Sequence, residues 1–495
     1  MTQSTKRTIQ KILIANRGEI SVRIQKTCQR LGIRTVAVYS EADQNANFVL
    51  MADEAVCIGA PEPSLSYLNQ EEILKACRST GADAVHPGYG FLSENASFAK
   101  GLADEGILFL GPKADSIDLM GDKIRSRDAM AKAGVPVVPG YSSDSNDVNA
   151  FLTEAKKIGF PVMIKATAGG GGKGMRKVDS EEEFIPSFES AVREATKAFG
   201  NGLVFLEKYI GNPRHIEFQI FGDSFGNVIH MHERDCSIQR RHQKVLEETP
   251  APNFPAEWKE KMAEYAVLAG KSIGYLGAGT VEFILGEDGS FFFLEMNTRL
   301  QVEHPVTEMV TGLDLVELQI QIAEGKELPA PLLEPDGVPQ NGHSMEVRVY
   351  AENPANQFLP SIGKIEWMKL PLSRGLRLDT GVETGSEVSI YYDPMIGKLI
   401  AHADSRETCR KKLLSALKKF VIFGPITNIN FLQNILQEPD FIDGKVSTHF
   451  LNGKDHLIYQ REDDKREALS LIFQLVQKPK VAKSIWEAIG NAFQV

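Results

Sequence analysis

The chain has 495 residues, enough for about two to four domains with cores of their own, so neither a peptide nor a small disulfide scaffold fits it. Its 55 Lys and Arg against 65 Asp and Glu leave a formal charge of −10, and no basic stretch offsets this balance, which argues against nucleic acid as a partner. No apolar run approaches the roughly 18 residues of a membrane span, so we expect a soluble protein with no membrane partner.

Two features of the sequence bear on its cellular compartment. The first ten residues are polar and lack the apolar core and cleavage site of a secretory signal, so we expect a cytoplasmic protein. The five cysteines are odd in number and show no CxxC or zinc spacing, which indicates reduced, structural thiols.

Strand and helix patterns alternate through the first part of the chain. Strands are predicted at Lys11–Ala15 and Arg34–Tyr39, and the helical spacing of Glu19–Leu31 stops at a glycine. The alternation then continues through Ile73–Cys77, Ala84–Pro87, Phe98–Asp104 and Ile107–Leu110. We therefore expect a doubly wound open sheet whose strand ends face a ligand crevice. We do not expect NAD to bind, because Gly18 alone follows the first strand where a dinucleotide site needs three glycines.

Two Pro- and Gly-rich breaks divide the rest of the chain. A helix from Asp122 to Gly134 is followed by Val135–Pro139, which we interpret as a hinge into a second domain. The second break, Leu328–Gly342, precedes short strands and a helix at Arg406–Lys419, so a third domain is predicted there. Two helices are predicted after Phe450, at Asp464–Gln477 and Lys480–Phe493.

A glycine-rich loop follows the strand predicted at Pro161–Lys165. Five of the six residues 169–174 are glycines, and Lys165 and Lys173 flank them. Backbone N–H groups without Cβ atoms can bind phosphate oxygens, and the two lysines can neutralise them. The loop lacks the end of a Walker motif, so a flexible linker is the alternative, but the adjoining strand and lysines favour phosphate binding.

A hairpin with acidic residues is predicted from two strand-like runs and the turn between them, Thr280–Leu285, Glu287–Gly289 and Phe291–Asn297. Folding it about the turn places Glu282 opposite Leu294 or Glu295, with Asn297 on the same face as Glu295. Two carboxylates and an amide oxygen suit Mg²⁺ or Mn²⁺. The alternative is an ordinary solvent-facing side of the sheet.

Three polar side chains alternate directly after this hairpin, Arg299, Gln301 and Glu303. In an extended chain they share one side, where the Arg and the amide could hold a small planar anion and the carboxylate could accept its proton. The alternative is a strand edge with solvated charges. Two other segments stay ambiguous: Glu233–Lys244 is dense in donors but also fits a solvated face, and Phe205–Ile210 fits a buried strand whose end could meet adenine.

Nine motifs of the chain resemble those of the biotin carboxylase family, within the ATP-grasp ligases. They are IANRGEI, HPGYGFLSEN, MGDK, KATAGGGGKGM, EKYI, NPRHIE, ERDCSIQRRHQKVLEE, FLEMNTRLQVEHPVTE and YYDPMIGKL, and the resemblance covers Lys11–Phe450. It implies a multidomain α/β and α+β fold. The implied parts are a Rossmann-like pre-ATP-grasp domain at 1–121, an ATP-grasp domain at 122–340 with a mobile lid at about 140–212, a mixed β-rich C-terminal domain at 341–455, and a helical tail of unassigned role at 456–495.

The resemblance also implies a reaction and partners. MgATP, or MnATP, and bicarbonate would carboxylate N1′ of biotin through carboxyphosphate, releasing ADP and phosphate, which makes the protein a ligase forming C–N bonds. This is the first half-reaction of a biotin-dependent acyl-CoA or pyruvate carboxylase. The implied partners are a biotin carboxyl carrier protein, a carboxyltransferase subunit and a second copy in a homodimer.

The motifs imply the following site residues. ATP would be bound by Lys123, Lys165, Gly171, Gly172, Glu207, Lys208, Ile210, His215, Gln239, His242, Glu282 and Glu295, and the metal by Glu282, Glu295 and Asn297. Bicarbonate would be bound by Lys244, Arg299, Gln301, Val302 and Glu303, and biotin by Tyr89 and Arg348. Of these, Lys244, Arg299, Glu303 and Arg348 would be catalytic, with Glu303 as the base and Arg348 stabilising the biotin enolate.

The sequence departs from the family pattern at two places. Lys173 stands in the glycine loop where relatives often have Arg, and the tail has no counterpart in the shared core. Met368-Lys369 is not the Met-Lys-Met of a biotin acceptor, so we expect biotin on a separate polypeptide. Two alternatives are another ATP-grasp ligase, of the carbamoyl-phosphate or purine type, which would lack the pairing of RRHQK with NTRLQVEHP, and a non-catalytic nucleotide-binding subunit, against which the intact site residues argue.

Overall fold

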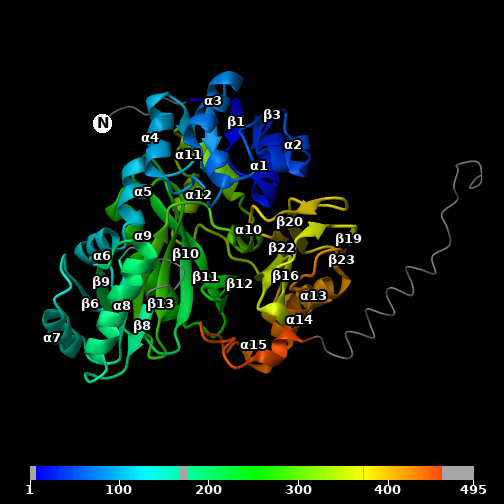
Figure 1. Ribbon diagram of the computed structural model, residues 1–495. Coiled ribbons are helices and arrows are strands. Elements are labelled where there is room, and N and C mark those ends of the chain that lie inside the picture. The colour runs from blue at the N-terminus through cyan, green and yellow to red at the C-terminus, as the bar shows by residue number, and fades with distance from the viewer. Residues whose placement is uncertain (1–6, 168–174, 372, 460–495) are drawn as a thin grey trace, which may run out of the picture.

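The computed structural model describes residues 7–167, 175–371 and 373–459 (Figure 1). The predictions for the glycine loop and for the two tail helices lie outside these residues. Three β-sheets organise the described chain: one near the N-terminus, a small one built from residues 140–208, and a large one that continues into the C-terminal part. Figure 1 shows the N-terminal part (blue) above the large sheet (green to yellow), with the small sheet and its helices (cyan) to one side.

The N-terminal part is a five-stranded parallel sheet in the order β3-β2-β1-β4-β5, which confirms the predicted doubly wound sheet. Its strands are β1 (Lys11–Ile14), β2 (Arg34–Tyr39), β3 (Glu54–Cys57), β4 (Ala84–His86) and β5 (Leu108–Phe109), and its helices are α1 (Gly18–Leu31), α2 (Asn47–Leu50), α3 (Gln70–Thr80), α4 (Ala96–Asp104) and α5 (Ala114–Gly121). Helix α1 ends at Gly32, whose φ of 71° is left-handed and therefore favours glycine.

A four-stranded sheet in the order β6-β9-β7-β8 forms a small unit of its own. Its elements are α6 (Lys123–Lys132), which leads into it, β6 (Gly140–Ser142), α7 (Val148–Ile158), β7 (Val162–Ala166), β8 (Met175–Val178), α8 (Phe184–Phe199) and β9 (Val204–Lys208). The two helices α7 and α8 pack on the sheet through a core that includes Phe151, Phe184 and Phe188.

The large sheet has eight strands in the order β14-β13-β10-β11-β12-β15-β22-β20. Its strands are β10 (Arg214–Gly222), β11 (Val228–Arg240), β12 (Gln243–Thr249), β13 (Gly277–Leu285), β14 (Phe291–Asn297), β15 (His343–Tyr350), β20 (Leu376–Thr380) and β22 (Met395–Ala403). Since β12 pairs with β15 from Leu246↔Val347 to Thr249↔Ser344, the sheet continues across residues 340–341, where the sequence predicts a domain boundary.

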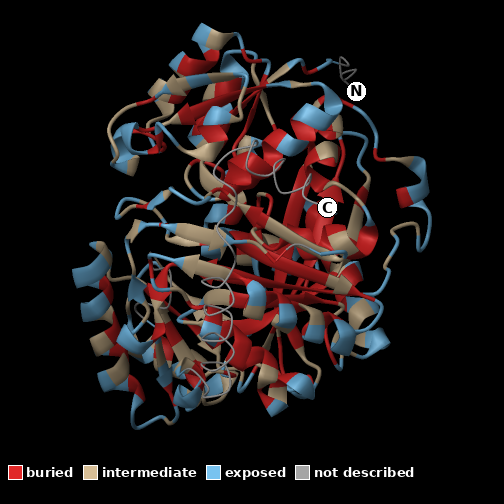
Figure 2. Cartoon of the chain, turned by 90° about the vertical axis from the view of Figure 1, so that its right-hand side faces the viewer, coloured by how far each residue is buried: buried red, intermediate tan, exposed pale blue. Residues whose placement is uncertain are grey.

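Helices and short strands complete the chain around this sheet. They are α9 (Ala256–Ser272), α10 (His304–Thr311), α11 (Leu315–Ala323), α12 (Ala330–Leu333), β16 (Glu352–Asn353), β17 (Leu359–Pro360), β18 (Gly363–Lys364), β19 (Trp367–Lys369), β21 (Glu387–Val388), α13 (Arg406–Lys419), β23 (Val421–Phe423), α14 (Ile429–Gln437) and α15 (Pro439–Ile442). Helix α13 has the predicted bounds, and the Ser405 hydroxyl caps its N-terminus by accepting from Thr408 N–H. Figure 2 shows the continuous buried core along the large sheet.

The structure corrects the prediction for the segment that follows β14. The segment after β14 is not an extended strand: it turns from residue 298 to 303 and enters α10 at His304. All five cysteines are free, and of these Cys57 is the exposed one. No helix in the described part of the chain is long and apolar enough to cross a membrane.

Candidate active site

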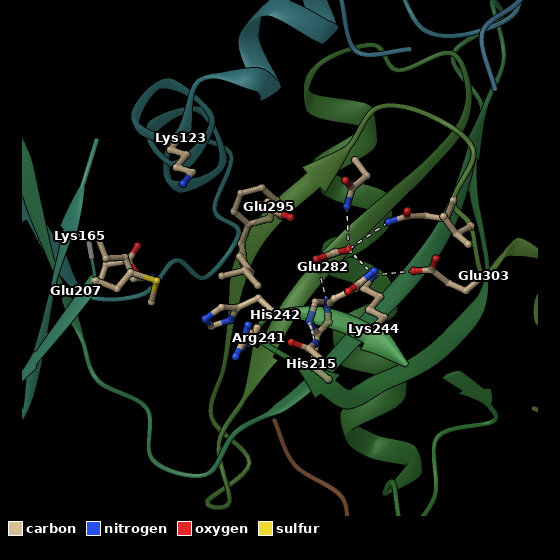
Figure 3. A pocket seen from close by; sticks show the side chains of 18 of the residues that line it. Lys123, Lys165, Glu207, His215, Arg241, His242, Lys244, Glu282, Glu295 and Glu303 are labelled. Atoms are coloured by element: carbon tan, nitrogen blue, oxygen red, sulfur yellow. Dashed lines mark hydrogen bonds and ion pairs between the residues drawn. The ribbon is translucent and has the colours of Figure 1, made fainter. Parts of the chain in front are cut away.

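A polar cavity of about 620 Å³ lies between the small and the large sheet. Figure 3 shows Lys165 and Glu207 on one side, Lys123 above, and the acidic and basic residues of the large sheet opposite. The structure brings together in its wall most residues that the sequence predicts for the site: Lys123, Lys165, Glu207, His215, Gln239, His242, Lys244, Glu282, Glu295, Asn297, Arg299, Gln301, Val302, Glu303 and Arg348.

Two lysines lie on the small-sheet side of the cavity. Lys165 on β7 forms an ion pair with Glu207 on β9, because these strands are antiparallel neighbours. Lys123 is the first residue of α6, where the Asp122 carboxylate caps the helix by accepting from the N–H groups of the second and third residues. Both ammonium groups are therefore held at the ends or edges of regular elements, where phosphate oxygens can reach them.

A β-bulge places two carboxylates opposite each other in the β13–β14 hairpin. Glu282 pairs with Glu295 whereas Phe283 pairs with Phe293, so Leu294 is an extra residue. The hairpin prediction is confirmed, and of its two registers the structure has the one with the two glutamates opposite each other. Glu282 Oε1 accepts from Asn297 Nδ2 at 2.8 Å, which brings the third predicted ligand to the same place.

Lys244 is a cation among three carboxyl groups on the large-sheet side of the cavity. Its Nζ lies 2.5 Å from Glu217 Oε2, 2.8 Å from Glu282 Oε1 and 2.6 Å from Glu303 Oε1. Burial alone would lower the pKa of Lys244, but the three carboxylates hold it well above its ordinary value. The ammonium is therefore charged at neutral pH, and the three carboxyl groups around it outnumber this single cation.

Glu303 is completely buried between two cations. Its Oε1 accepts from Lys244, and its Oε2 accepts from Arg348 Nη2 at 3.0 Å. Burial raises the pKa of Glu303, but Lys244 and Arg348 outweigh it and hold this pKa well below the ordinary value. Glu303 is thus an ionised acceptor at the N-cap position of α10, in contact with both a lysine and an arginine.

Arg348 connects Glu303 to a second buried carboxylate. Its Nε donates to Glu247 Oε1 at 2.7 Å. Burial is the main cause that raises the pKa of Glu247 to about 7; Arg348 opposes it and the charge of Glu303 adds to it. The carboxyl of Glu346, opposite Glu247 in the β12–β15 register, has no hydrogen-bond partner among the described residues, and burial holds its pKa well above the ordinary value. The group around Arg348 therefore contains two buried carboxyl groups whose pKa values are both raised.

The residues predicted to bind a planar anion converge in the irregular segment rather than along a strand. Arg299 Nη1 donates to Gln301 Oε1 at 2.6 Å and its Nη2 donates to Asn297 Oδ1 at 3.0 Å, while Gln301 Nε2 donates to Glu282 Oε1 at 3.2 Å. The solvated strand edge, the alternative for this segment, is wrong because Gln301 and Glu303 are buried.

Sequence reasoning missed several residues of the site. Arg234 is fully buried and donates to Glu217 Oε1 at 2.5 Å and to Gln219 Oε1 at 2.9 Å, and Glu94 from the N-terminal part accepts from Arg299 Nε at 2.9 Å. The donor-dense run that contains Arg234 was the available signal, and it forms the β11–β12 hairpin, which is buried from Glu233 to Ile238 and exposed only at its turn. Nothing local in the sequence distinguishes Glu94.

Three predicted residues do not line the cavity wall among the described residues: Lys208, Ile210 and Tyr89. Lys208 Nζ donates to the Gly159 carbonyl at 2.7 Å, and the Tyr89 hydroxyl forms a short hydrogen bond with Glu19. Gly171 and Gly172 lie outside the described residues.

The raised pKa of Glu247 should make the unfolding free energy of the protein depend on pH. Between pH 4.5 and about 7 the folded chain keeps a proton that the unfolded chain loses, so this group makes stability fall as pH rises. Relative to Glu247→Gln, we expect the wild type to lose about 3 kcal/mol of unfolding free energy between pH 5 and 8. Urea unfolding at the two pH values measures this difference.

Glu248→Gln is the matched control for this experiment. Glu248 is the next residue but faces the other side of the sheet, where His343 and Arg406 outweigh burial and lower its pKa. Its contribution is complete above pH 4.5 and is lost only below it, so its effect should be the same at pH 5 and 8. Equal behaviour of the two variants would contradict the assignment of the titrating group to Glu247.

Comparison with known proteins agrees with this architecture. Three family models match the chain: "Biotin carboxylase, N-terminal domain" at 8–117, "Carbamoyl-phosphate synthase L chain, ATP binding domain" at 122–331, and "Biotin carboxylase C-terminal domain" at 346–453. The three sheets and the cavity between two of them thus define a three-part protein built around an ATP-binding domain. The chain belongs to the biotin carboxylase family.

Individual relatives are similar over most of the chain. Biotin carboxylase of Nostoc sp. is 52% identical over 441 residues, which are 89% of this chain and 98% of that protein. The mitochondrial methylcrotonoyl-CoA carboxylase subunit alpha of Dictyostelium discoideum is 52% identical over 90% of this chain, which spans 63% of that longer protein.

Solved structures are similar as well. The biotin carboxylase domain dimer of Hydrogenobacter thermophilus 2-oxoglutarate carboxylase, in complex with MgADP, ADP and bicarbonate, has a TM-score of 0.86 and 48% identity and covers 92% of this chain and 100% of that one. A Campylobacter jejuni biotin carboxylase in complex with a β-γ-ATP ligand has a TM-score of 0.85 and 46% identity, covering 90% of this chain and 98% of that one.

Proposed function

We propose that this chain uses ATP and bicarbonate to carboxylate N1′ of biotin held by a carrier protein, releasing ADP and phosphate. The observation that supports this most directly is Glu303, an ionised acceptor clamped between Lys244 and Arg348 at one side of a cavity whose other side presents Lys123 and Lys165. A proton acceptor, an anion site and phosphate-binding cations within one cavity suit phosphoryl transfer to bicarbonate. The related structures with MgADP and bicarbonate are consistent with it.

The nucleotide would lie between the two sheets. Lys123 and Lys165 would contact its phosphates, and the end of β9 at Glu207, Lys208 and Ile210 would face adenine. His215, Gln239 and His242 line the same cavity on the side of the large sheet. Gln239 Nε2 lies 2.8 Å from His215 Nδ1, so the two side chains already orient each other.

The donor set fits a hard divalent cation. Glu282 and Glu295 are opposed in register, and Asn297 Oδ1 adds an amide oxygen that now accepts from Arg299. When bound, Mg²⁺ or Mn²⁺ would neutralise charge on the phosphates. Glu295 is the exposed member of this pair, and the neighbouring charge of Glu282 disfavours its ionised form, so a cation nearby would stabilise it.

We expect Glu295→Ala to raise the Mg²⁺ concentration needed for half-maximal ATP cleavage and to reduce turnover, because Glu282 and Asn297 alone leave the cation with too few ligands. A Mg²⁺ titration of ADP release at fixed ATP measures this. The control is Glu287→Ala in the turn of the same hairpin, whose carboxylate accepts from Asn212 outside the cavity. An unchanged Mg²⁺ requirement in Glu295→Ala would reject this residue as a ligand.

Bicarbonate would bind among Lys244, Arg299, Gln301 and Val302. Glu303 would accept the bicarbonate proton while a bicarbonate oxygen bonds to the γ-phosphorus and the bond to the bridging oxygen of ADP breaks, which yields carboxyphosphate. Its collapse gives CO₂ and phosphate, and this phosphate would accept the N1′ proton of biotin. Arg348 and Tyr89 would face the biotin ring, and Arg348 would stabilise the enolate.

The test of this proposal is ADP release with and without bicarbonate and free biotin, together with detection of carboxybiotin. Release that depends on both substrates supports it. ADP release that does not depend on biotin but needs another nucleophile would indicate a different ligase of the same fold. ATP binding without turnover would indicate a non-catalytic subunit.

The wider assembly is part of the same proposal. A biotin carboxyl carrier protein, a carboxyltransferase subunit and a second copy of the chain are the expected partners; the related structure with MgADP and bicarbonate is a domain dimer. We also propose the division into units at 1–121, 122–340 and 341–455. A cytoplasmic location stays a prediction, and the Dictyostelium relative is named as mitochondrial.

A further inference from the structure

Lys398 is a completely buried lysine at the meeting point of three parts of the chain. It lies in the middle of β22, and its side chain has no exposed surface. A buried ammonium is costly unless it is paired and hydrogen-bonded. Its Nζ meets this need with Glu19 Oε1 at 3.0 Å and the Val302 carbonyl oxygen at 2.8 Å, while Asp379 Oδ2 is more distant at 3.9 Å.

The two close partners come from different units. Glu19 is in the first turn of α1 in the N-terminal part, and Val302 is in the irregular segment between β14 and α10. Lys398 itself belongs to the strand that pairs with β15, opposite Arg348. One side chain thus joins the N-terminal part, the segment at the cavity and the C-terminal strands.

Each partner is in direct contact with a residue assigned to a substrate under the proposed function. Val302 stands between Gln301 and Glu303, which are both buried and both line the cavity. Glu19 is the acceptor for the Tyr89 hydroxyl. The ammonium therefore links the peptide that precedes the proposed base to the carboxylate that holds the tyrosine proposed to face biotin.

Stability alone does not account for a lysine at this position. Replacing both partners of a buried ion pair by apolar side chains of similar volume is often neutral or stabilising, so an apolar pair in place of Lys398 and Glu19 could pack at least as well. What an apolar residue could not do is donate to the Val302 carbonyl and to Glu19 together. This donor geometry points to an orienting role.

We propose that Lys398 is a positioning residue, which fixes the bicarbonate-binding segment at Val302 and the biotin-facing Tyr89, through Glu19, in one mutual geometry. The inference rests on the proposed function and adds to it a group that touches neither substrate. A displacement of about 1 Å between reacting groups can cost about 10²-fold in rate. Lys165 on β7 and Lys123 on α6, the lysines proposed to contact phosphate, lie on elements outside this link.

The experiment measures steady-state kinetics of Lys398→Met, with rates normalised to folded protein. We expect kcat/KM for free biotin to fall about 10²-fold and KM for bicarbonate to rise, with KM for MgATP within about twofold of wild type. Lys411→Met is the control, because this lysine on α13 is exposed and its ion-pair partner within the described part of the chain is the surface residue Glu407. A purely structural role would lower the folded fraction and leave all three KM values unchanged, which would overturn the proposal.

Two further variants keep the test decisive if Lys398→Met does not fold. Glu19→Gln combined with Lys398→Met removes both charges together, so no unpaired buried charge remains, and the same KM pattern is expected. Glu19→Asp keeps the charge but shortens the side chain, and a smaller shift of about threefold in KM for biotin and bicarbonate is expected. Wild-type KM values in both would reject the proposal. Failure of the proposed function itself would be seen separately, as wild-type protein without biotin-dependent ADP release.

Discussion

Replacing Glu303 by Gln is expected to lower biotin-dependent ATP cleavage by about 10²- to 10⁴-fold while MgATP still binds. The amide keeps the shape of the side chain, but it cannot accept the proton of bicarbonate. In addition, its NH₂ group would face either Lys244 or Arg348, which are both donors. The fold should persist because Lys244 keeps Glu217 and Glu282 as partners.

The low pKa of Glu303 determines how readily it can accept a proton before bicarbonate binds. While Lys244 and Arg348 both donate to it, Glu303 is a weak base. A bound bicarbonate would compete for the donors of Lys244 and so raise the basicity of Glu303 in the complex. The base would therefore be activated by the substrate that it deprotonates.

Calorimetric titration with MgATP and a coupled assay of ADP release measure the two halves of this prediction. The matched control is Glu308→Gln, on helix α10, which begins directly after Glu303; Glu308 is also buried, and its ion pairs with Arg23 and Arg377 lie outside the cavity. It should lower thermal stability but leave turnover per folded molecule unchanged. Turnover of Glu303→Gln within twofold of wild type would remove Glu303 from the mechanism.

Lys244→Met is expected to affect both stability and activity. It leaves three buried carboxylates without their shared cation, and breaking a buried pair in this way costs about 3 to 5 kcal/mol. It also removes a donor from the proposed anion site, for which a loss of about 10²- to 10³-fold in turnover is expected.

The pH dependence of the unfolding free energy shows whether lost charge pairing causes the loss of stability in Lys244→Met. In the wild type Glu282 and Glu303 have lowered pKa values, so their contribution is present above their ordinary pKa and is lost as pH falls. In Lys244→Met their folded pKa values rise, so the variant becomes less stable as pH rises. The stability gap between the two proteins should therefore widen from pH 5 to pH 8 in thermal unfolding.

Lys259→Met serves as the control, because Lys259 pairs with one buried carboxylate, Glu233, outside the cavity. It should show a smaller pH dependence and normal turnover per folded molecule. A gap between wild type and Lys244→Met that is equal at both pH values would show that lost packing, not lost charge, destabilises the variant.

Local patterns in the sequence determined much of the architecture. The β-branched run at Arg34–Tyr39 and the helical spacing of Arg406–Lys419 occur in the structure with the predicted bounds, because propensity, capping and burial agree there. The 280–297 hairpin was predictable from its turn and its apolar alternation. The long motifs around the site were sufficient to place the chain in its family.

Only the tertiary structure decided how the site residues meet. The bulge at Leu294 puts Glu295 opposite Glu282. In a second register shift, Ile238 pairs with Leu246 but Gln239 with Lys244, so that Lys244 lines the cavity and Glu247 contacts Arg348, which also lines it. One inserted residue reverses the face of every side chain beyond it, and its position depends on the partner strand. Likewise, buried charges such as Lys398 acquire their partners only when segments distant in sequence pack together, which no local pattern records.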